Sequence, residues 1–220
     1  MTDRYAGQRR ALLETMQARG IRDLAVLRAF DLVHRHAFLP EAVRHRAYED
    51  APVPIGFAQT ASQPSLQALY MQVLQLQEDD RVLEIGTGCG FQTAVLAQLV
   101  DRVYSVERIR ELAVRARAAL DAAHASNVAT LVGDGTIGWS RYAPYDAILV
   151  AAAAPHYPQP LLDQLAEGGR MLIPVGTQAT QRLMLVRRTG DGIEEEEVTA
   201  CTFVPLLGRF GWSGDGPQGG

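Results

Sequence analysis

The sequence predicts an α/β fold: a doubly wound, Rossmann-like sheet, mostly parallel, with antiparallel C-terminal strands and an N-terminal helical extension. Two observations support this prediction. The first is an alternation of short apolar runs with helix-like segments, because strands separated by helices pair in parallel. The second is a glycine-rich turn, Gly86-Thr-Gly-Cys-Gly90, directly after the first apolar run. Such turns lie where ligands bind at the carboxyl edge of a parallel sheet.

The elements follow in order along the chain. Two amphipathic helices are expected first, one ending near Gly20 and the next capped by Asp23. Residues 40–64 are expected to be irregular, since two prolines and a glycine within 52–56 forbid a long helix. A helix is then expected over 64–76, where a proline is tolerated in the first turn.

The central region carries the predicted sheet. Strands are expected at 81–85, 102–107, 127–132, 145–150 and 170–175. Helices are expected at 91–99, 109–124 and 158–166. An antiparallel hairpin follows, with strands at 182–188 and 195–204 around a turn at 189–192. The chain therefore divides into an N-terminal extension at 1–78, a core at 79–207 and a glycine-rich, flexible tail at 208–220.

Composition limits the function classes. The chain has 220 residues, a net charge of -4 and 47% apolar residues, typical of a globular domain rather than a general nucleic-acid binder. Its two cysteines provide neither a disulfide framework nor metal-ligand spacing, so no metal is expected. No apolar run approaches the roughly 20 residues of a membrane span. We therefore expect a cytoplasmic protein that binds neither nucleic acid nor membrane; its oligomeric state is not predicted.

The spacing of the glycines narrows the class of ligand. A dinucleotide-binding turn reads G-x-G-x-x-G, whereas Phe91 stands here in place of the third glycine. No Lys-Ser/Thr pair follows, which excludes a P-loop. Glu107, at the end of the second strand, can accept hydrogen bonds from ribose hydroxyls. The pattern favours S-adenosylmethionine (SAM), a nucleoside cofactor without phosphate, over a dinucleotide or a turn that binds no ligand.

Further short segments occur in a specific order and spacing. They are Ala47-Tyr-Glu-Asp50, Pro54-Ile-Gly56, Gln59-Thr-Ala-Ser-Gln-Pro64, Val82-Leu-Glu-Ile-Gly-Thr-Gly88, Val103-Tyr-Ser-Val-Glu-Arg108, Gly133-Asp-Gly135, Ala151-Ala-Ala-Ala-Pro155, Gly168-Gly-Arg170, Ile173-Pro-Val-Gly176 and Phe203-Val-Pro-Leu206. Over about residues 20–207, the chain resembles the protein-L-isoaspartate O-methyltransferase family. The segment 59–64 is the specific part, because the glycine turn alone indicates only a SAM-dependent methyltransferase.

The resemblance implies a concrete reaction. The family transfers the SAM methyl group to the free α-carboxylate of L-isoaspartyl residues in damaged proteins and peptides, with S-adenosylhomocysteine as the second product. The ester then closes to a succinimide, whose hydrolysis returns some normal aspartate. A carboxylate is already ionised at neutral pH and a sulfonium is a good leaving group, so the reaction requires neither a general base nor a metal.

Ser62 is the residue to which the resemblance assigns catalysis, at the place where substrate carboxylate and cofactor meet. A hydroxyl can position a carboxylate by donating a hydrogen bond. Ser62 is also suited to cap the helix that begins near Pro64, and the two roles are compatible. Around it, the resemblance implies that Thr60 and Ala61 contact the cofactor and Gln63 the substrate.

The other implied site residues follow the ends of the strands. For the cofactor they are Gly86, Thr87, Gly88 and Gly90 near the methionine tail, Glu107 at the ribose, and Asp134 and Gly135 at the adenine. For the substrate they are Ala153, Pro155 and Val204.

The sequence departs from the family's usual pattern in four places. Ala61 stands for an isoleucine, Cys89 for a serine, Ala151 for a threonine, and Phe57-Ala58 for His-Gly or similar. Because two of these lie near the implied substrate side, two other hypotheses stay open. One is a relative that methylates an aspartate of a peptide natural product, and the other is a SAM-binding module without turnover. A dehydrogenase is the least favoured alternative.

Overall fold

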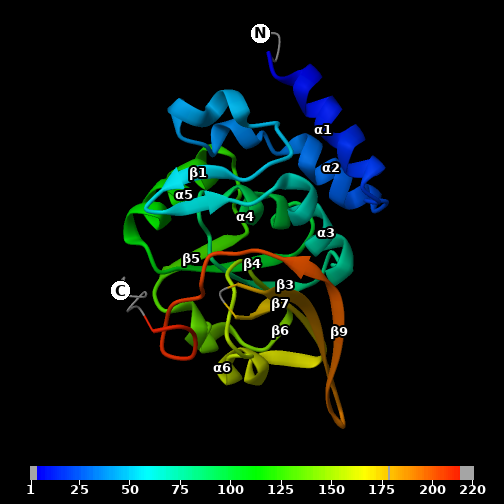
Figure 1. Ribbon diagram of the computed structural model, residues 1–220, viewed down its shortest axis with the longest axis vertical. Coiled ribbons are helices and arrows are strands. Elements are labelled where there is room, and N and C mark those ends of the chain that lie inside the picture. Colours follow the sequence, from blue (N-terminus) through cyan, green and yellow to red (C-terminus); the bar gives the residue numbers. More distant parts are fainter. Residues whose placement is uncertain (1–3, 178, 214–220) are drawn as a thin grey trace.

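The computed structural model describes residues 4–177 and 179–213. Its centre is a seven-stranded sheet with the order β5-β4-β3-β6-β7-β8-β9 (Figure 1). The strands are β3 (Arg81–Ile85), β4 (Arg102–Glu107), β5 (Val128–Val132), β6 (Tyr145–Val150), β7 (Leu165–Gly176), β8 (Gln181–Thr189) and β9 (Gly192–Cys201). The strands from β5 to β7 pair in parallel, and β8 and β9 are antiparallel. The predicted fold class is confirmed.

Alternate residues of β3 pack on opposite faces of the sheet. Val82 belongs to the hydrophobic cluster of the face covered by α3 (Pro64–Leu74), α4 (Phe91–Leu96) and α5 (Arg110–Ala122). Leu83 and Ile85 belong to the cluster of the other face, which α6 (Gln159–Asp163) covers with the short helices η3 (Gly135–Ile137) and η4 (Ser140–Tyr142). Figure 1 shows α6 below the sheet and the longer helices above it.

The N-terminal extension packs onto the same core as the sheet. Its helices α1 (Ala6–Ala18) and α2 (Leu24–Leu32) contribute Met16 and Phe30 to the cluster that contains Val82. Asp23 caps α2 by accepting from the backbone N–H groups of residues 25 and 26, as predicted. The extension is therefore continuous with the hydrophobic core and holds its site residues at a fixed place relative to the sheet.

The segment 40–64 is more regular than predicted. It contains the short helix η2 (Glu41–Arg46), preceded by η1 (Arg35–Ala37), and an antiparallel hairpin of β1 (Val53–Gly56) and β2 (Gln59–Ala61). The two-residue turn is formed by Phe57 and Ala58, both with positive φ. Such turns usually carry Asn-Gly or Asp-Gly, so their sequence signal was missing here. The expectation of an irregular segment was wrong.

Other element boundaries also differ from the prediction. Helix α4 ends at Leu96 rather than near 99, although Leu99 and Val100 remain buried and continue the apolar pattern. Helix α6 ends at Asp163, because Leu165 already pairs with Tyr145 of β6. The C-terminal hairpin is confirmed, but its second strand begins at 192 and ends at 201.

The start of the expected tail is held against the core. Gly208 N–H donates to the carbonyl of Trp212 at 3.2 Å, and the Trp212 indole N–H donates to the carbonyl of Ala153 at 3.1 Å. The N–H of Arg209 reaches a carboxylate oxygen of Asp134 at 2.7 Å. Residues 208–212 thus form a bonded loop instead of a loose end, and the expectation for 214–220 lies outside the described residues.

Candidate active site

The glycine turn leaves the carboxyl end of β3 in a conformation that suits glycine. Gly86, Gly88 and Gly90 all have positive φ, at 97°, 56° and 86°. Gly86 and Gly88 line a cavity together with Thr87. Gly90 does not line it: a Cβ there would lie 3.2 Å from the Ala116 Cβ of α5. Gly90 therefore allows α4 and α5 to pack closely, while the first two glycines face the cavity.

Glu107 joins the turn to the next strand. One carboxylate oxygen accepts from the Gly88 N–H and the other from the Ile109 N–H, both at 2.9 Å. The side chain is only 6% exposed and lines the cavity. Because a carboxylate has about four acceptor positions, Glu107 can hold the turn and still accept from ribose hydroxyls.

A second carboxylate, Glu84, lies within β3 and was not predicted to matter. It is fully buried and accepts from the Gln92 amide at 3.0 Å and from the hydroxyls of Ser105 and Thr93 at 2.6 and 2.5 Å. Burial raises the pKa of Glu84 to about 7, and these three hydrogen bonds offset part of the rise. Ser105 also contacts the Thr87 hydroxyl at 2.6 Å, so the network supports the glycine turn from below.

The same network fixes the amide orientation of Gln67 in α3. Gln92 donates its NH₂ group to Glu84, so its oxygen accepts from the Gln67 amide nitrogen at 3.2 Å. The oxygen of Gln67 is left without a hydrogen-bond donor among the described residues, although the residue is 5% exposed and lines the cavity. A buried acceptor of this kind calls for a polar partner. The ammonium group of the SAM methionine tail fits it.

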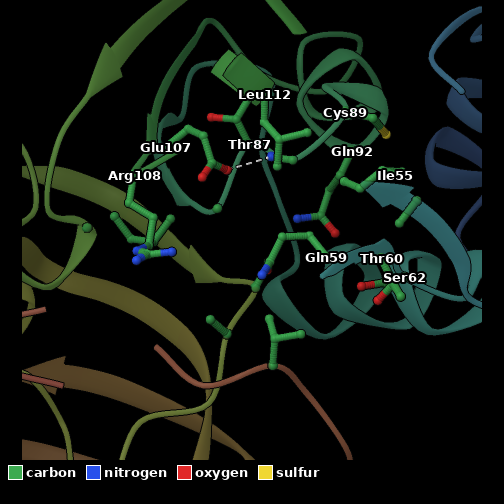
Figure 2. A pocket seen from close by; sticks show the side chains of 18 of the residues that line it. Ile55, Gln59, Thr60, Ser62, Thr87, Cys89, Gln92, Glu107, Arg108 and Leu112 are labelled. Carbon is green, nitrogen blue, oxygen red and sulfur yellow. Dashed lines mark hydrogen bonds between the residues drawn. The ribbon is translucent and has the colours of Figure 1, made fainter. Parts of the chain in front are cut away.

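The residues around the cavity separate into two ends. Figure 2 shows Glu107 and Arg108 on one side and Gln92, Thr60 and Ser62 on the other. The lining also includes Ile85, Val106, Leu112 and Gly135. A carboxylate at one end and a free amide oxygen at the other match a ligand with a ribose at one end and an amino-acid tail at the other. SAM, with this polarity and no phosphate, therefore fits the residues present.

Ser62 does not cap helix α3. The N-cap residue is Gln63, and its side chain makes no capping bond. Asp50 performs this role from a distant part of the chain: one oxygen accepts from the Ser65 N–H at 2.9 Å and the other from the Gln63 amide at 3.0 Å. The capping interpretation of Ser62 was wrong, because Asp50 already occupies the helix N-terminus.

A second cavity adjoins the first. It is lined by Pro52, Gln63, Leu66 and residues 200–203, together with Thr60, Ser62, Ala151 and Val204. These last four residues also line the first cavity. Ser62 is half-buried at this shared wall, and its hydroxyl donates to none of the described residues. The predicted residues Thr60, Ser62, Gln63 and Val204 are thus brought together from segments about 140 residues apart.

Besides Gly90, three predicted site residues line neither cavity. The Asp134 carboxylate accepts from the N–H and hydroxyl of Thr136 and from the Arg209 N–H, and only its neighbour Gly135 lines the first cavity. Partial burial by itself raises the pKa of Asp134. The hydrogen bonds lower the pKa by more than burial raises it, so the net pKa lies below its usual value. Ala153 is buried in a bridge with Pro205, and neither it nor Pro155 lines the two cavities.

Sequence reasoning missed several lining residues, including Ile55, Gln59, Gln67, Gln92 and Arg108. One signal was available: an acidic residue inside the apolar strand 81–85 must find buried donors. Polar residues on nearby helix faces, such as Gln92, were candidates for that partner. The position of Gln67 depends on how α3 crosses α4, which no local pattern contains.

The fold and the two cavities define a class of protein, the SAM-dependent methyltransferases. The comparisons with known proteins narrow it. The sequence model of the protein-L-isoaspartate(D-aspartate) O-methyltransferase family matches residues 7–211. Protein-L-isoaspartate O-methyltransferase 2 of Geotalea uraniireducens is 50% identical over 94% of this chain and 96% of its own length. The enzyme of Syntrophus aciditrophicus is 47% identical over 97% of this chain and all of its own length.

Solved structures agree. A protein-L-isoaspartate O-methyltransferase superposes with a TM-score of 0.86 at 29% identity, covering 92% of this chain and 67% of the other. A putative one from Plasmodium falciparum, in complex with S-adenosyl-L-homocysteine, superposes with a TM-score of 0.80 at 26% identity, covering 90% and 97%. This chain belongs to the protein-L-isoaspartate (D-aspartate) O-methyltransferase family.

Proposed function

We propose that this chain transfers a methyl group from SAM to the free α-carboxylate of L-isoaspartyl residues in proteins and peptides. The observation that carries the proposal is the wall shared by the two cavities, made by Thr60, Ser62, Ala151 and Val204. Methyl transfer needs one space for the cofactor and one for the peptide, meeting where the methyl group passes. The family and its relatives support the isoaspartyl substrate.

The chemistry asks little of the protein beyond alignment. When bound, SAM supplies a methyl group already activated by a sulfonium. The substrate carboxylate is ionised at neutral pH, so no residue has to remove a proton. The protein then contributes orientation and the exclusion of water. We assign the orienting role to Ser62, whose hydroxyl can donate to one carboxylate oxygen and leave the other free to attack.

The proposed orientation of SAM follows from the polar groups at the two ends of the first cavity. We propose that Glu107 accepts from the ribose hydroxyls and that the turn around Gly86 and Gly88 lies along the methionine tail. Gln67, an acceptor without a donor in the described part of the chain, would take the ammonium group. Gly135, which also lines this cavity, would lie at the adenine. The carboxylate of Asp134 would have to exchange its bond with Arg209 to reach an adenine amine.

The N-terminal extension and the core build the substrate side jointly. We propose that residues 1–78 supply Thr60, Ser62 and Gln63, while the core supplies Ala151 and Val204. Among the residues the structure describes, no helix is long and apolar enough to cross a membrane. Both cysteines are free, which suits the reducing cytoplasm, the compartment in which we propose that the chain acts.

One assay tests the substrate. Purified protein and labelled SAM are given matched peptides that carry isoaspartate or aspartate at a single position. Methyl transfer to the isoaspartyl peptide alone is the expected result. Transfer to the aspartyl peptide instead would favour a natural-product methyltransferase, and SAM binding with no transfer to either would favour a module without turnover.

A second experiment tests Ser62. Ser62→Ala should lower kcat by about 10-fold or more, the effect of one hydrogen bond to a charged group, while the Kd of S-adenosylhomocysteine stays nearly unchanged. The matched control is Ser140→Ala, an exposed serine in η4 that lines neither cavity. Unchanged turnover in Ser62→Ala would disprove the assigned role.

A further inference from the structure

Arg35 is a buried cation that forms no ion pair with the residues described by the structure. Its side chain lies in η1 and is 0% exposed. Within the part of the chain that the structure describes, it makes no ion pair, and its Nε has no hydrogen-bond partner. Burial lowers the pKa of Arg35 to about 10, so the group stays charged at neutral pH. Burying such a charge is costly unless its N–H donors are satisfied. The acceptors that Arg35 binds therefore indicate its role.

The guanidinium group binds backbone carbonyls of two distant segments. One terminal nitrogen donates to the carbonyl of Ala47 at 2.9 Å and, more weakly, to that of Glu49 at 3.5 Å. The other donates to the carbonyl of Ser62 at 3.0 Å. A planar fork with fixed N–H directions holds two carbonyls in a defined relative geometry, whereas the rotatable donors of an ammonium group on a flexible stem do not fix that geometry.

The fork also lies near the residue that follows the glycine turn. Its Cζ lies 5.7 Å from the ring centre of Phe91, the first residue of α4 after Gly90. Phe91 packs edge-on against Phe30 and Phe38 of the N-terminal extension, with ring centres 5.6 and 6.0 Å away. The aromatic ring that replaces the third glycine of a dinucleotide turn therefore supports Arg35, and Arg35 in turn supports Ser62.

The backbone of Ser62 is thus held while its hydroxyl is not. Arg35 binds its carbonyl, and Asp50 fixes the next residues by accepting from the Gln63 amide and the Ser65 N–H. None of these bonds uses the Ser62 hydroxyl, which stays available at the wall between the cavities.

We propose that Arg35 is a positioning residue for the methyl transfer. By binding the Ser62 carbonyl, it fixes the backbone from which the Ser62 hydroxyl projects, and through Phe91 it ties that backbone to the start of α4, directly after the glycine turn. The inference rests on the proposed function, in which Ser62 orients the substrate carboxylate.

The test is a double-mutant cycle. Arg35→Lys keeps the charge but loses the fork, and it is made in the natural sequence and in the Ser62→Ala background. We expect Arg35→Lys to lower kcat for an isoaspartyl peptide by about 10-fold, with the Kd of S-adenosylhomocysteine unchanged within about twofold. In the Ser62→Ala background the same substitution should leave kcat unchanged, because the hydroxyl it positions is gone.

The matched control is Arg117→Lys. Arg117 also donates to a backbone carbonyl, that of Val128 at 3.1 Å, and its Nε also has no partner among the described residues. Unlike Arg35 it pairs with an acidic residue, Asp121, and it lies on α5 and lines neither cavity. Its substitution should leave kcat unchanged. Thermal unfolding of each variant separates loss of fold from loss of turnover, and Arg35→Gln, which removes the charge and keeps a single NH₂ donor group, replaces the lysine variant if that variant is unstable.

Three outcomes overturn the inference. An equal loss of kcat from Arg35→Lys in both backgrounds would show that Arg35 acts independently of Ser62. A parallel loss of cofactor affinity and turnover would show a general structural role. If Ser62→Ala alone has full turnover, the assigned role of Ser62 fails and the inference fails with it, whereas the first outcome leaves that role intact.

Discussion

Replacing Gln67 with leucine should weaken binding of the amino-acid end of the cofactor and leave binding of its nucleoside end unchanged. Glu84 fixes the amide of Gln92, and Gln92 fixes the amide of Gln67, a residue that lines the cavity, so that the buried oxygen of Gln67 has no donor among the described residues. A hydrogen bond to a charged group contributes about 1.5–3 kcal/mol. Its loss corresponds to about a 10- to 150-fold increase in Kd.

The assay is calorimetric titration with two ligands. S-adenosylhomocysteine carries the ammonium group, and 5′-methylthioadenosine lacks the whole amino-acid tail. Gln67→Leu should raise the Kd of the first ligand only. Gln72→Leu is the control, since Gln72 lies on the same helix but accepts from the backbone N–H groups of Arg22 and Asp23. An equal increase in the Kd of both ligands for Gln67→Leu, or no increase for either, would refute the inference that Gln67 binds the ammonium group.

Two further predictions concern stability. Since the pKa of Glu84 is raised from 4.5 to about 7, the folded state binds more protons than the unfolded state between these values, and stability falls as pH rises through this range. Denaturant titrations should show that the free energy of unfolding of the natural sequence falls by up to about 3 kcal/mol relative to that of Glu84→Gln between pH 4.5 and 7.5. The same pH dependence in both proteins would contradict the raised pKa of Glu84. Gly90→Ala should lower the free energy of unfolding by about 1–3 kcal/mol, because φ is +86° and the new Cβ meets Ala116 at 3.2 Å. Gly7→Ala, in an open position of α1, should instead stabilise by about 0.5–1 kcal/mol, and equal effects of the two would exclude the steric explanation.

Most of the core could be predicted from the sequence. The strands 81–85, 102–107 and 145–150 were found at their observed limits, because each is an apolar run bounded by turn signals. The ends of helices were less predictable. Leu165 looked like the end of a helix but pairs with Tyr145, and only its partner strand makes it part of the sheet.

The hairpin of β1 and β2 shows a different kind of failure. Phe57 and Ala58 adopt positive φ without the residues that usually signal such a turn. Their conformation is held by pairing of the flanking strands and by the Arg115 guanidinium over the Phe57 ring at 5.4 Å. Neither contact is local in sequence, so no turn could be predicted there.

The sequence by itself determined the class of fold, the kind of cofactor and the family, because these depend on periodicity, glycine spacing and short motifs that are local in the chain. Tertiary structure decided what the motifs do. It gave the capping of α3 to Asp50 rather than Ser62 and placed Ser62 between two cavities. It also turned Phe91 toward Arg35. A hydrogen bond or a cavity wall joins residues tens of positions apart, and only the packed chain brings them within reach.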